Sequence, residues 1–571
     1  MTADCLLALY DRVAAAPDAI PRLRRFVLDL AVRGKLVPQA PKDEPAQVPP
    51  SVAAGTKERS RARGKTEPLS NLPYPLPVTW RWVRIGDQLE LLNGMAFKPS
   101  DWVPTGIRIV RIQNLNRMDA PFNFCDPKIA RERSLIDDGT FLISWSGTPG
   151  TSFGAFIWSR GPAVLNQHIF RCDFKTNAFS AEYLRLAING RLDEMIQKAH
   201  GGVGLQHITK GKLESMLIPL PPLAEQHRIV AKVDELMALC DRLEAARATR
   251  EATRDRLTTA SLARLTAPDT DAKTFRIHAH FALDALPALT TRPDQITQLR
   301  QTILNLAVRG KLVAQDPADE PASELLKRIA KGKRRMRREI FMIDPKATPY
   351  SLPVTWEWAS LDQLILAGPQ NGISPKPTTR EDAPKAVTLT ATTSGVFNPA
   401  HFKRVEANIH DESDFWLTDG DLLFQGGNTR EYVGIAAIYN GPPKSFLFPD
   451  LIMKVRVSDL VNLRFVHLAA VSPPARTFLS ENASGAQATM PKINQTTLVS
   501  LPIPLPPLAE QHRIVAKVDA LMALCARLEA SLATADTTRT RLLESLLHEA
   551  LAPVVGNDDR SIPTSSFAVH A

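Results

Sequence analysis

The chain has 571 residues, a formal net charge of +10 and hydrophobic residues at 44% of its positions. Its length predicts about three to four domains, and the apolar fraction excludes wholesale disorder. The positive charge favours a polyanionic partner, although an ordinary solvated basic surface is an alternative. The five cysteines form no CxxC pair, which argues against a ribbon-type metal site and favours buried thiols in a reducing compartment.

The first residues, MTADCLLALYDRV, lack the basic region and the apolar length of a signal peptide. No window approaches about 18 uncharged apolar residues, the length that a membrane-spanning helix needs. We therefore expect no membrane partner and a cytoplasmic location.

Sequence repeats divide the chain into two copies of one plan. The segments Ile218–Ala245 and Ile503–Ala530 are identical except at Glu235/Ala520 and Asp241/Ala526. Upstream, LAVRGKLV occurs at 30–37 and 306–313, DEPA begins at 43 and 319, and LPVTW begins at 76 and 352. The offset rises from 276 in these upstream repeats to 285 in the first pair, so the second copy holds a net nine extra residues between them. Each copy is predicted to contain a helix, a basic stretch, a variable segment and a long helix.

The first predicted helix covers residues 20–33. An apolar stripe lies on one helical face, formed by Ile20, Leu23, Val27, Leu30 and Ala31. Gly34 follows as a C-terminal stop. The second copy repeats this pattern with Ile296, Leu299, Ile303, Leu306 and Ala307, followed by Gly310. We interpret both stripes as packing faces.

A basic stretch precedes each variable segment. KERSRARGK covers residues 57–65, and KRIAKGKRRMRR covers residues 327–338. Such runs are usually solvated linkers, but their matching positions give the alternative of phosphate contacts equal weight.

The variable segments, residues 83–217 and 359–502, carry short-strand signals. Alternating and β-branched residues are interrupted by Gly, Pro, Asn and Ser in GIRIVRIQNL, in residues 141–174, in GDLLFQGGN and in EYVGIAAIYN. DDGTFLISWSG, from Asp137, resembles TDGDLLFQGGN, from Thr418. We predict one α/β fold that presents two different surfaces.

The repeat PPLAEQHRIVAKVD begins a long helix in each copy. Pro221 and Pro222 suit a first helical turn, and Glu225 lies near the positive end of the helix dipole. A helix over 222–266 would be about 65–70 Å long. A rod of this length predicts a coiled-coil partner, which we assign to the other repeated helix. We expect the helix near 20–33 to pack beside a distal helix at 507–548, in a bundle of about four long helices with the two inserts at its ends.

Motifs of catalytic chemistry are incomplete in this sequence. Ser472-Pro473-Pro474-Ala475 resembles an amino-methyltransferase motif, but Ala475 replaces the aromatic residue that stacks on a flipped base. GGVG at 201–204 has no strand–GxGxxG–helix context. Leu213 follows Lys212 where a P-loop requires Ser or Thr. We therefore predict no catalytic, cofactor-binding or metal-binding residue in this chain.

The repeated pattern resembles that of a known family. LPxPLPPLAEQxRIVAKVDELMALCDxLE after a variable segment, given twice, is similar to the specificity subunit of type I restriction–modification systems. The DEPA segments, LNQHIF at 165–170 and GDLLF at 420–424 strengthen the resemblance, which covers about residues 5–550.

The resemblance implies two target recognition domains, each of which reads one half of a split double-stranded DNA sequence. Antiparallel conserved helices would separate them and set the distance between the half-sites. Two methyltransferase subunits would dock on the repeats, and motor-nuclease restriction subunits would join them. S-adenosylmethionine, ATP and Mg²⁺ would then belong to those partners and not to this chain.

We therefore predict an α+β protein with a pseudo-twofold internal repeat. Its predicted segments are an N-terminal helix and basic linker (1–68), target recognition domain 1 (69–217), a central conserved helical region (218–345), target recognition domain 2 (346–502), a distal conserved helix (503–550) and a flexible tail (551–571).

Candidate DNA contacts are polar, basic or aromatic residues expected in loops that reach a groove. In the first insert they are Lys98, Arg108, Arg111, Gln113, Asn114, Trp145, Thr148, Gln167, His168 and Lys210. In the second insert they are Lys376, Gln425, Asn428, Thr429, Arg430, Lys492 and Asn494. Each could instead be an ordinary surface or turn residue, and for Asn166 we prefer the turn interpretation.

Two other functions fit parts of the sequence. The chain could serve a DNA methyltransferase that has no nuclease, which neighbouring genes would reveal. It could also be a coiled-coil scaffold without nucleic acid, but clusters of Arg, Lys, Asn and Gln in the inserts argue against this.

Overall fold

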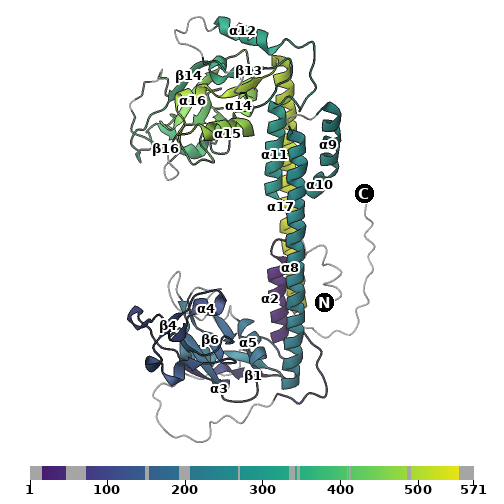
Figure 1. Ribbon diagram of the computed structural model, residues 1–571, viewed down its shortest axis with the longest axis vertical. Helices are drawn as coiled ribbons and strands as arrows, with labels where there is room; N and C mark the ends of the chain where they lie inside the picture. The colour runs from purple at the N-terminus through teal and green to yellow at the C-terminus, as the bar shows by residue number, and fades with distance from the viewer. Residues whose placement is uncertain are drawn as a thin grey trace. The chain divides into compact units, whose positions relative to one another are not determined.

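Figure 1 shows the computed structural model. It describes residues 16–46, 72–147, 153–191, 206–267, 271–332, 341–343, 348–407, 409–410, 413–484 and 490–551. The chain forms two compact units, unit 1 with Met1–Thr249 and Asp536–Ala571, and unit 2 with Arg250–Ala535. The boundaries of the six predicted segments remain predictions. The first basic stretch and most of the tail lie outside the described residues.

Unit 1 contains an α/β domain, which we call sheet domain 1, between strands β1 and β12. Its strands are β1 (Arg81–Arg84), β2 (Leu89–Asn93), β3 (Ile107–Val110), β4 (Asn123–Cys125), β5 (Leu135–Ile136), β6 (Phe141–Ser144), β7 (Ser146–Gly147), β8 (Gly154–Ile157), β9 (Ala163–Leu165), β10 (Ile169–Phe174), β11 (Gln206–His207) and β12 (Leu217–Leu220). Its α-helices are α3 (Ile85–Gln88), α4 (Ile112–Asn116), α5 (Ala181–Asn189) and α7 (Lys210–Ser215).

Unit 2 contains sheet domain 2, between strands β13 and β20. Its strands are β13 (Glu357–Ser360), β14 (Ile365–Asn371), β15 (Lys385–Val387), β16 (Phe402–Arg404), β17 (Leu422–Gln425), β18 (Ala436–Ile438), β19 (Ile452–Val457) and β20 (Pro502–Leu505). Its α-helices are α13 (Leu361–Leu364), α14 (Leu463–Val471), α15 (Pro473–Glu481) and α16 (Gln495–Val499).

The two sheet domains share one topology. The central sheet has the order β2-β10-β6-β8 in domain 1 and β14-β19-β17-β18 in domain 2. β1 pairs with β12 at the base of the first domain, and β13 pairs with β20 in the second. α5 packs on the first central sheet and α14 on the second, where buried apolar side chains form each core.

The α-helices outside the sheet domains are α2 (Ala19–Val32), α8 (Leu223–Thr266), α9 (Ala272–Asp284), α10 (Leu286–Leu289), α11 (Pro293–Val308), α12 (Ala322–Gly332) and α17 (Leu508–Leu551). Two pairs of them come from repeated segments, α2 with α11 and α8 with α17. The long helices α8 and α17 start near the predicted residues and cover the predicted ranges, because no Gly or Pro interrupts them. These elements confirm the predicted α+β class, the two α/β domains, the long helices and the internal repeat.

Within unit 1, α2 packs on both long helices. Its Val27 and Ala31 share a core with Ile229 of α8. Its Ala19 packs with Leu543 near the end of α17, which confirms the predicted contact between the N-terminal and distal helices. In unit 2, α11 makes the corresponding contacts with α17 and with the end of α8.

A duplicated set of polar contacts attaches each sheet domain to its long helix, and we call each set a joint. In joint 1, Trp80 Nε1 donates to Glu225 Oε2 at 3.0 Å, and Gln39 Nε2 donates to Glu225 Oε1 at 2.6 Å. Arg228 of the same helix forms an ion pair with Asp43 of the DEPA segment at 2.5 Å. The LPVTW and DEPA segments are therefore both bound by the first turns of the same repeated helix.

Joint 2 reproduces this geometry. Trp356 Nε1 donates to Glu510 Oε2 at 3.0 Å, and Gln315 Nε2 donates to Glu510 Oε1 at 2.6 Å. Arg513 and Asp319 are 2.6 Å apart. Burial raises the pKa of Glu225 and of Glu510.

The glycines after α2 and α11 complete the joints. Gly34 and Gly310 have φ values of +68° and +66°, which L side chains rarely adopt. A Cβ atom would lie 2.4 Å from Pro77 at the first and 2.5 Å from Pro353 at the second. The LAVRGKLV and LPVTW repeats thus occur together because the first packs on the second.

Candidate nucleic-acid interface

The central sheet of domain 1 gathers several predicted contact residues at one edge. β6 ends at Ser144, which pairs with Ile169 at the start of β10. β2 ends at Asn93, opposite Phe170. The loop after β6 and the loop before β10 therefore start at the same end of the sheet, which we call its edge, and they bring Trp145 and His168 together.

Aromatic packing supports this edge. The Trp145 ring stacks on Phe170 with a centroid distance of 5.5 Å and lies 5.8 Å from His168. The backbone N–H of Trp145 donates to His168 O at 3.3 Å. Gln167 is exposed beside them, with its Nε2 3.3 Å from His168 Nε2. The exposed amide of Gln167 therefore lies next to a packed group of aromatic rings, Trp145, His168 and Phe170.

Lys210 reaches the same edge from α7. Its Nζ donates to Leu91 O at 2.8 Å and lies 3.7 Å from Glu214 Oε1. Ile208, two residues earlier, donates its N–H to Trp145 O at 3.1 Å. The Lys210 cation is therefore close to the aromatic group but partly neutralised by its own helix.

Other predicted residues lie on the smaller sheet of domain 1, which has the order β4-β3-β9-β5. Arg108 on β3 is exposed, and its Nη1 donates to Arg160 O at 2.6 Å. Arg111 is half-buried, with Nη2 3.4 Å from Asn123 Oδ1, and Gln113 is exposed on α4. Lys98, five residues after β2, is exposed as well.

Sheet domain 2 presents the matching edge. Gln425 at the end of β17 pairs with Ile452, and Asn371 at the end of β14 pairs with Met453. Asn428, Thr429 and Arg430 follow β17 in a loop where Thr429 and Arg430 are exposed.

Further predicted residues surround this second edge. Lys492 is exposed and makes a bridge to Gly427. Asn494 caps α16, where its Oδ1 accepts from Thr497 N at 2.7 Å. Lys376 is exposed five residues after β14, as Lys98 is after β2.

Two predicted contacts are wrong because their side chains are buried and fully engaged. Asn114 Oδ1 accepts from Arg111 N at 3.0 Å, and its Nδ2 donates to Ala120 O and Pro121 O at 3.1 Å. Gln425 is 0% exposed and donates to the segment after β15. Neither side chain has an atom available for a base edge. Thr148 lies outside the described residues, and the other assignments stay predictions.

The short strand predicted in GIRIVRIQNL, residues 106–115, is confirmed as β3, which ends at Val110, after which the chain turns into the short helix α4. Asn114 closes this turn by accepting from the N–H of Arg111, a local side-chain bond that competes with strand pairing. Asn166 lies in a turn, as preferred above, and its carbonyl accepts from Ile169 N at 3.1 Å.

Asn371 and Gln495 were not among the predicted contacts. Gln495 Nε2 donates to Asn371 Oδ1 at 2.8 Å, and both residues are exposed at the edge of the second central sheet. The signal was present, because Gln495 follows Lys210 by the repeat offset of 285 and Asn371 ends β14 as Asn93 ends β2.

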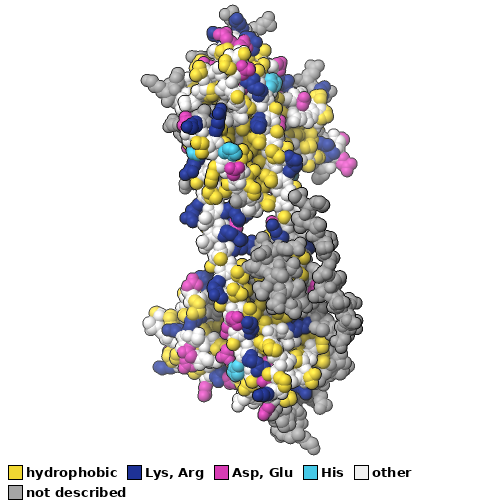
Figure 2. Space-filling model, turned by 90° about the vertical axis from the view of Figure 1, so that its right-hand side faces the viewer, with side chains coloured by type: hydrophobic (Ala, Val, Ile, Leu, Met, Phe, Trp, Pro, Cys, Tyr) yellow, Lys and Arg dark blue, Asp and Glu magenta, His cyan; other side chains and the backbone are white. Residues whose placement is uncertain are grey.

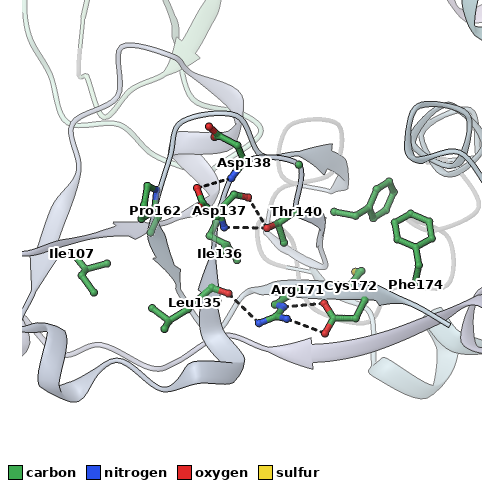
Figure 3. A pocket seen from close by; sticks show the side chains of 14 residues that line it. Ile107, Leu135, Ile136, Asp137, Asp138, Thr140, Pro162, Arg171, Cys172 and Phe174 are labelled. Carbon is green, nitrogen blue, oxygen red and sulfur yellow. Dashed lines mark hydrogen bonds and ion pairs between the residues drawn. The ribbon is translucent and has the colours of Figure 1, made fainter.

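A surface concavity on sheet domain 1 does not add to this interface (Figure 3). The Arg171 guanidinium donates to both carboxylate oxygens of Asp173, at 2.9 and 3.1 Å, and its Nη1 donates to Leu135 O at 3.2 Å. Asp137 and Asp138 also line this concavity. The cation is already neutralised, so this hollow is a poor site for a phosphate.

The charge on one face of the molecule does not mark a DNA-binding surface there. On the face that Figure 2 shows, basic and acidic side chains are interspersed over the described surface. Within the described ranges, no three His, Cys, Asp or Glu side chains come together as metal ligands. In the same part of the chain, no helix has both the length and the apolar character needed to cross a bilayer.

Comparisons with known proteins show which family model and which relatives this chain resembles. The model of the type I restriction modification DNA specificity domain matches residues 77–251 and 353–534. The specificity subunits of the type I restriction enzymes EcoEI and EcoAI, both from Escherichia coli, are each 27% identical to this chain, over 93% of it and 94% of their own lengths. The crystal structure of the HsdS subunit from Thermoanaerobacter tengcongensis covers 84% of this chain and 98% of its own, with 19% identity and a TM-score of 0.40.

Proposed function

Because the chain belongs to the type I restriction–modification DNA specificity family and is a specificity subunit with two such domains, we propose that each sheet domain binds one half of a split DNA target. The two domains share a fold but differ in the residues at their sheet edges, as at Trp145 and Gly426 or Lys210 and Gln495. The target is therefore double-stranded, bipartite and asymmetric.

The observation that carries this proposal is the duplicated joint. Identical contacts around Glu225 and Glu510 attach two different surfaces in the same way to two nearly identical helices. Two equivalent surfaces on one chain suit two copies of one partner, as the symmetry of a dimer suits two half-sites. We assign these surfaces to two methyltransferase subunits, to which restriction subunits add.

In this assignment, the chain contributes recognition and no catalytic group. S-adenosylmethionine would be bound by the methyltransferase subunits, and ATP and Mg²⁺ by the restriction subunits. The chain would act in the cytoplasm, where its DNA and its partners are found.

The test is to exchange one sheet domain. Residues 83–217 would be replaced by the corresponding segment of another family member, and the variant would be expressed with its methyltransferase partner. Sequencing of methylated bases should show one changed half-site, with the other half and the spacer unchanged. Methylation of the original sequence in both halves would contradict the proposal.

A further inference from the structure

In the smaller sheet of each domain, one loop connects two antiparallel strands, and the two loops occupy corresponding positions. β3 pairs antiparallel with β4, and residues 111–122 join them. β15 pairs antiparallel with β16, and residues 388–401 join them. β9 runs parallel to β3, and Leu447 makes a parallel bridge to Ala386 of β15, so the two sheets share a topology. We call residues 111–122 loop A and residues 388–401 loop B.

Each loop has a cation near its start. Arg108 and Lys385 each lie two residues before the last residue of their strands, β3 and β15. The Arg108 guanidinium lies 5.6 Å from the Phe122 ring centroid, and the Lys385 ammonium lies 4.9 Å from that of Phe402. Neither cation forms an ion pair with a described carboxylate. Each is thus held in place while its charge stays available to a phosphate.

Buried and half-buried polar side chains fix loop A from within. Asn114, which is 0% exposed, binds three backbone groups of the loop, at its start and near its end. Arg160, from the segment after β8, donates to Met118 O at 3.3 Å and also to Asn114 O. Its guanidinium packs on Phe122 and Trp158 at 4.9 and 4.7 Å. The course of the loop backbone is set before any partner binds.

Different side chains fix loop B. Gln425 Nε2 donates to Leu389 O at 2.7 Å and lies 2.9 Å from Thr392 Oγ1. His467 of α14, which is 3% exposed, has its Nε2 3.0 Å from Gly395 O. Because Arg464 Nη1 lies 3.1 Å from the other ring nitrogen, His467 is neutral with its proton on Nε2, and burial lowers its pKa to about 4.

The tips of both loops are exposed and mix amide with apolar groups. Met118 in loop A is 78% exposed, and Val396 in loop B is 66% exposed. Gln113 of loop A and Asn398 of loop B are exposed as well. In Figure 1, β4 lies on the side of its domain away from α8, and β16 on the side of its domain away from α11. The long helices therefore leave both loop regions uncovered.

We propose that loops A and B are preformed DNA-reading loops, one in each domain, with Asn114 and Arg160 as positioning residues of loop A, and Gln425 and His467 as positioning residues of loop B. This inference rests on the proposed function, to which it adds the element that reads bases. Amide tips suit adenine edges and apolar tips suit the thymine methyl group, while Arg108 and Lys385 contact phosphate.

The anchoring explains why buried polar groups are kept in these domains. A buried amide or imidazole destabilises the fold unless every bond is made, so an apolar residue would serve a plain core better. Fixing a loop in advance removes the entropy loss of ordering it on DNA. The anchors differ between the copies because each holds a loop of a different shape.

The first experiment changes the tips. Gln113→Ala with Met118→Ala, and Val396→Ala with Asn398→Ala, would each be assembled with the methyltransferase partner, and methylated sites would be sequenced. Each pair should lower discrimination about tenfold at one or more positions of its own half-site, with the other half unchanged. Ile129→Ala and Leu460→Ala, which alter exposed apolar residues elsewhere in the same domains, should leave both halves unchanged.

The second experiment tests the positioning residues. His467→Leu removes the ring donor, whereas His467→Gln keeps an N–H near the same place. The first should relax the second half-site, and the second should restore it, with thermal unfolding measured for both. Full discrimination in all tip variants would overturn the inference, even if exchange of residues 83–217 still changed a half-site. Failure of that exchange would instead contradict the proposed function.

Discussion

The joints are built from the same residues in both copies, whereas the proposed reading loops are held by different residues. At the joints, the two copies use the same residue types at the same distances, as for Trp80 with Glu225 and Trp356 with Glu510. In loops A and B, the same place in the fold is fixed by unrelated side chains, Asn114 in one and Gln425 in the other. The comparison indicates that attachment to the helix is kept constant and the surface offered to DNA is free to change.

The largest expected change comes from lengthening the connection between the joints. The unit boundaries fall between Thr249 and Arg250 in α8 and between Ala535 and Asp536 in α17, nearly equivalent points of the repeat. Four residues added at both points should lengthen each helix by about 6 Å and the DNA spacer by roughly one to two base pairs. Both half-sites should keep their bases. Methylation mapping checks this, and new bases in either half would show that spacing and reading are not separable.

Next in size is the loss of a joint tryptophan. Trp80→Ala and Trp356→Ala each remove a buried ring and a donor to a buried carboxylate. Each should lower the free energy of unfolding of its own unit by about 3–5 kcal/mol. Denaturant unfolding monitored by hydrogen exchange would assign the loss to unit 1 or unit 2. Clearly unequal losses would show that the joints are alike in geometry but not in energy.

A smaller effect is expected from exposed residues at the sheet edges. Gln167→Ala in domain 1 and Arg430→Ala in domain 2 should each weaken specific binding by about 1–3 kcal/mol and relax one position of the corresponding half. Binding to DNA duplexes that vary at single positions would measure this. Arg380→Ala is a matched control, because Arg380 is exposed but paired with Asp382 at 2.6 Å.

The smallest effect concerns pH. Burial raises the pKa of Glu225 above its ordinary value of 4.5, so the folded state favours the protonated carboxyl. Stability from this group is fully present below about pH 4.5 and is lost as pH rises through the folded pKa. Glu225→Gln removes that titration. The difference in the free energy of unfolding between the native protein and the variant should therefore shrink as pH rises. Glu510→Gln should behave alike, since burial also raises the pKa of Glu510. An advantage that grows with pH would contradict this assignment.

The sequence predicted the helices well and the joints not at all. α2, α8, α11 and α17 begin with apolar stripes and contain no internal Gly, and these local signals favour a helix. Trp80 and Glu225 are far apart in the chain. The repeats showed that both residues recur in the second copy, but they did not show that the two residues contact each other.

The candidate interface was predicted in part. Trp145, Gln167 and His168 meet at one edge because strand order brings their loops together. Asn114 and Gln425 were wrong because residue type does not reveal whether an amide faces solvent or the core. Lys385 was not among the predicted contacts, because its place on β15 near loop B depends on strand pairing that the diverged sequences do not show.

The packing of Ala19 on Leu543 also sets an order of assembly during synthesis. Unit 2 is one continuous stretch of chain, whereas unit 1 combines the beginning of the chain with its last helical turns. As the ribosome releases the chain from its N-terminus, the second unit can close first although most of the first was made earlier. Lys35 Nζ donates to Leu551 O at 2.9 Å, a bond that can form only after residue 551 has been synthesised. A chain truncated before residue 536 would therefore lack the part of α17 that completes unit 1.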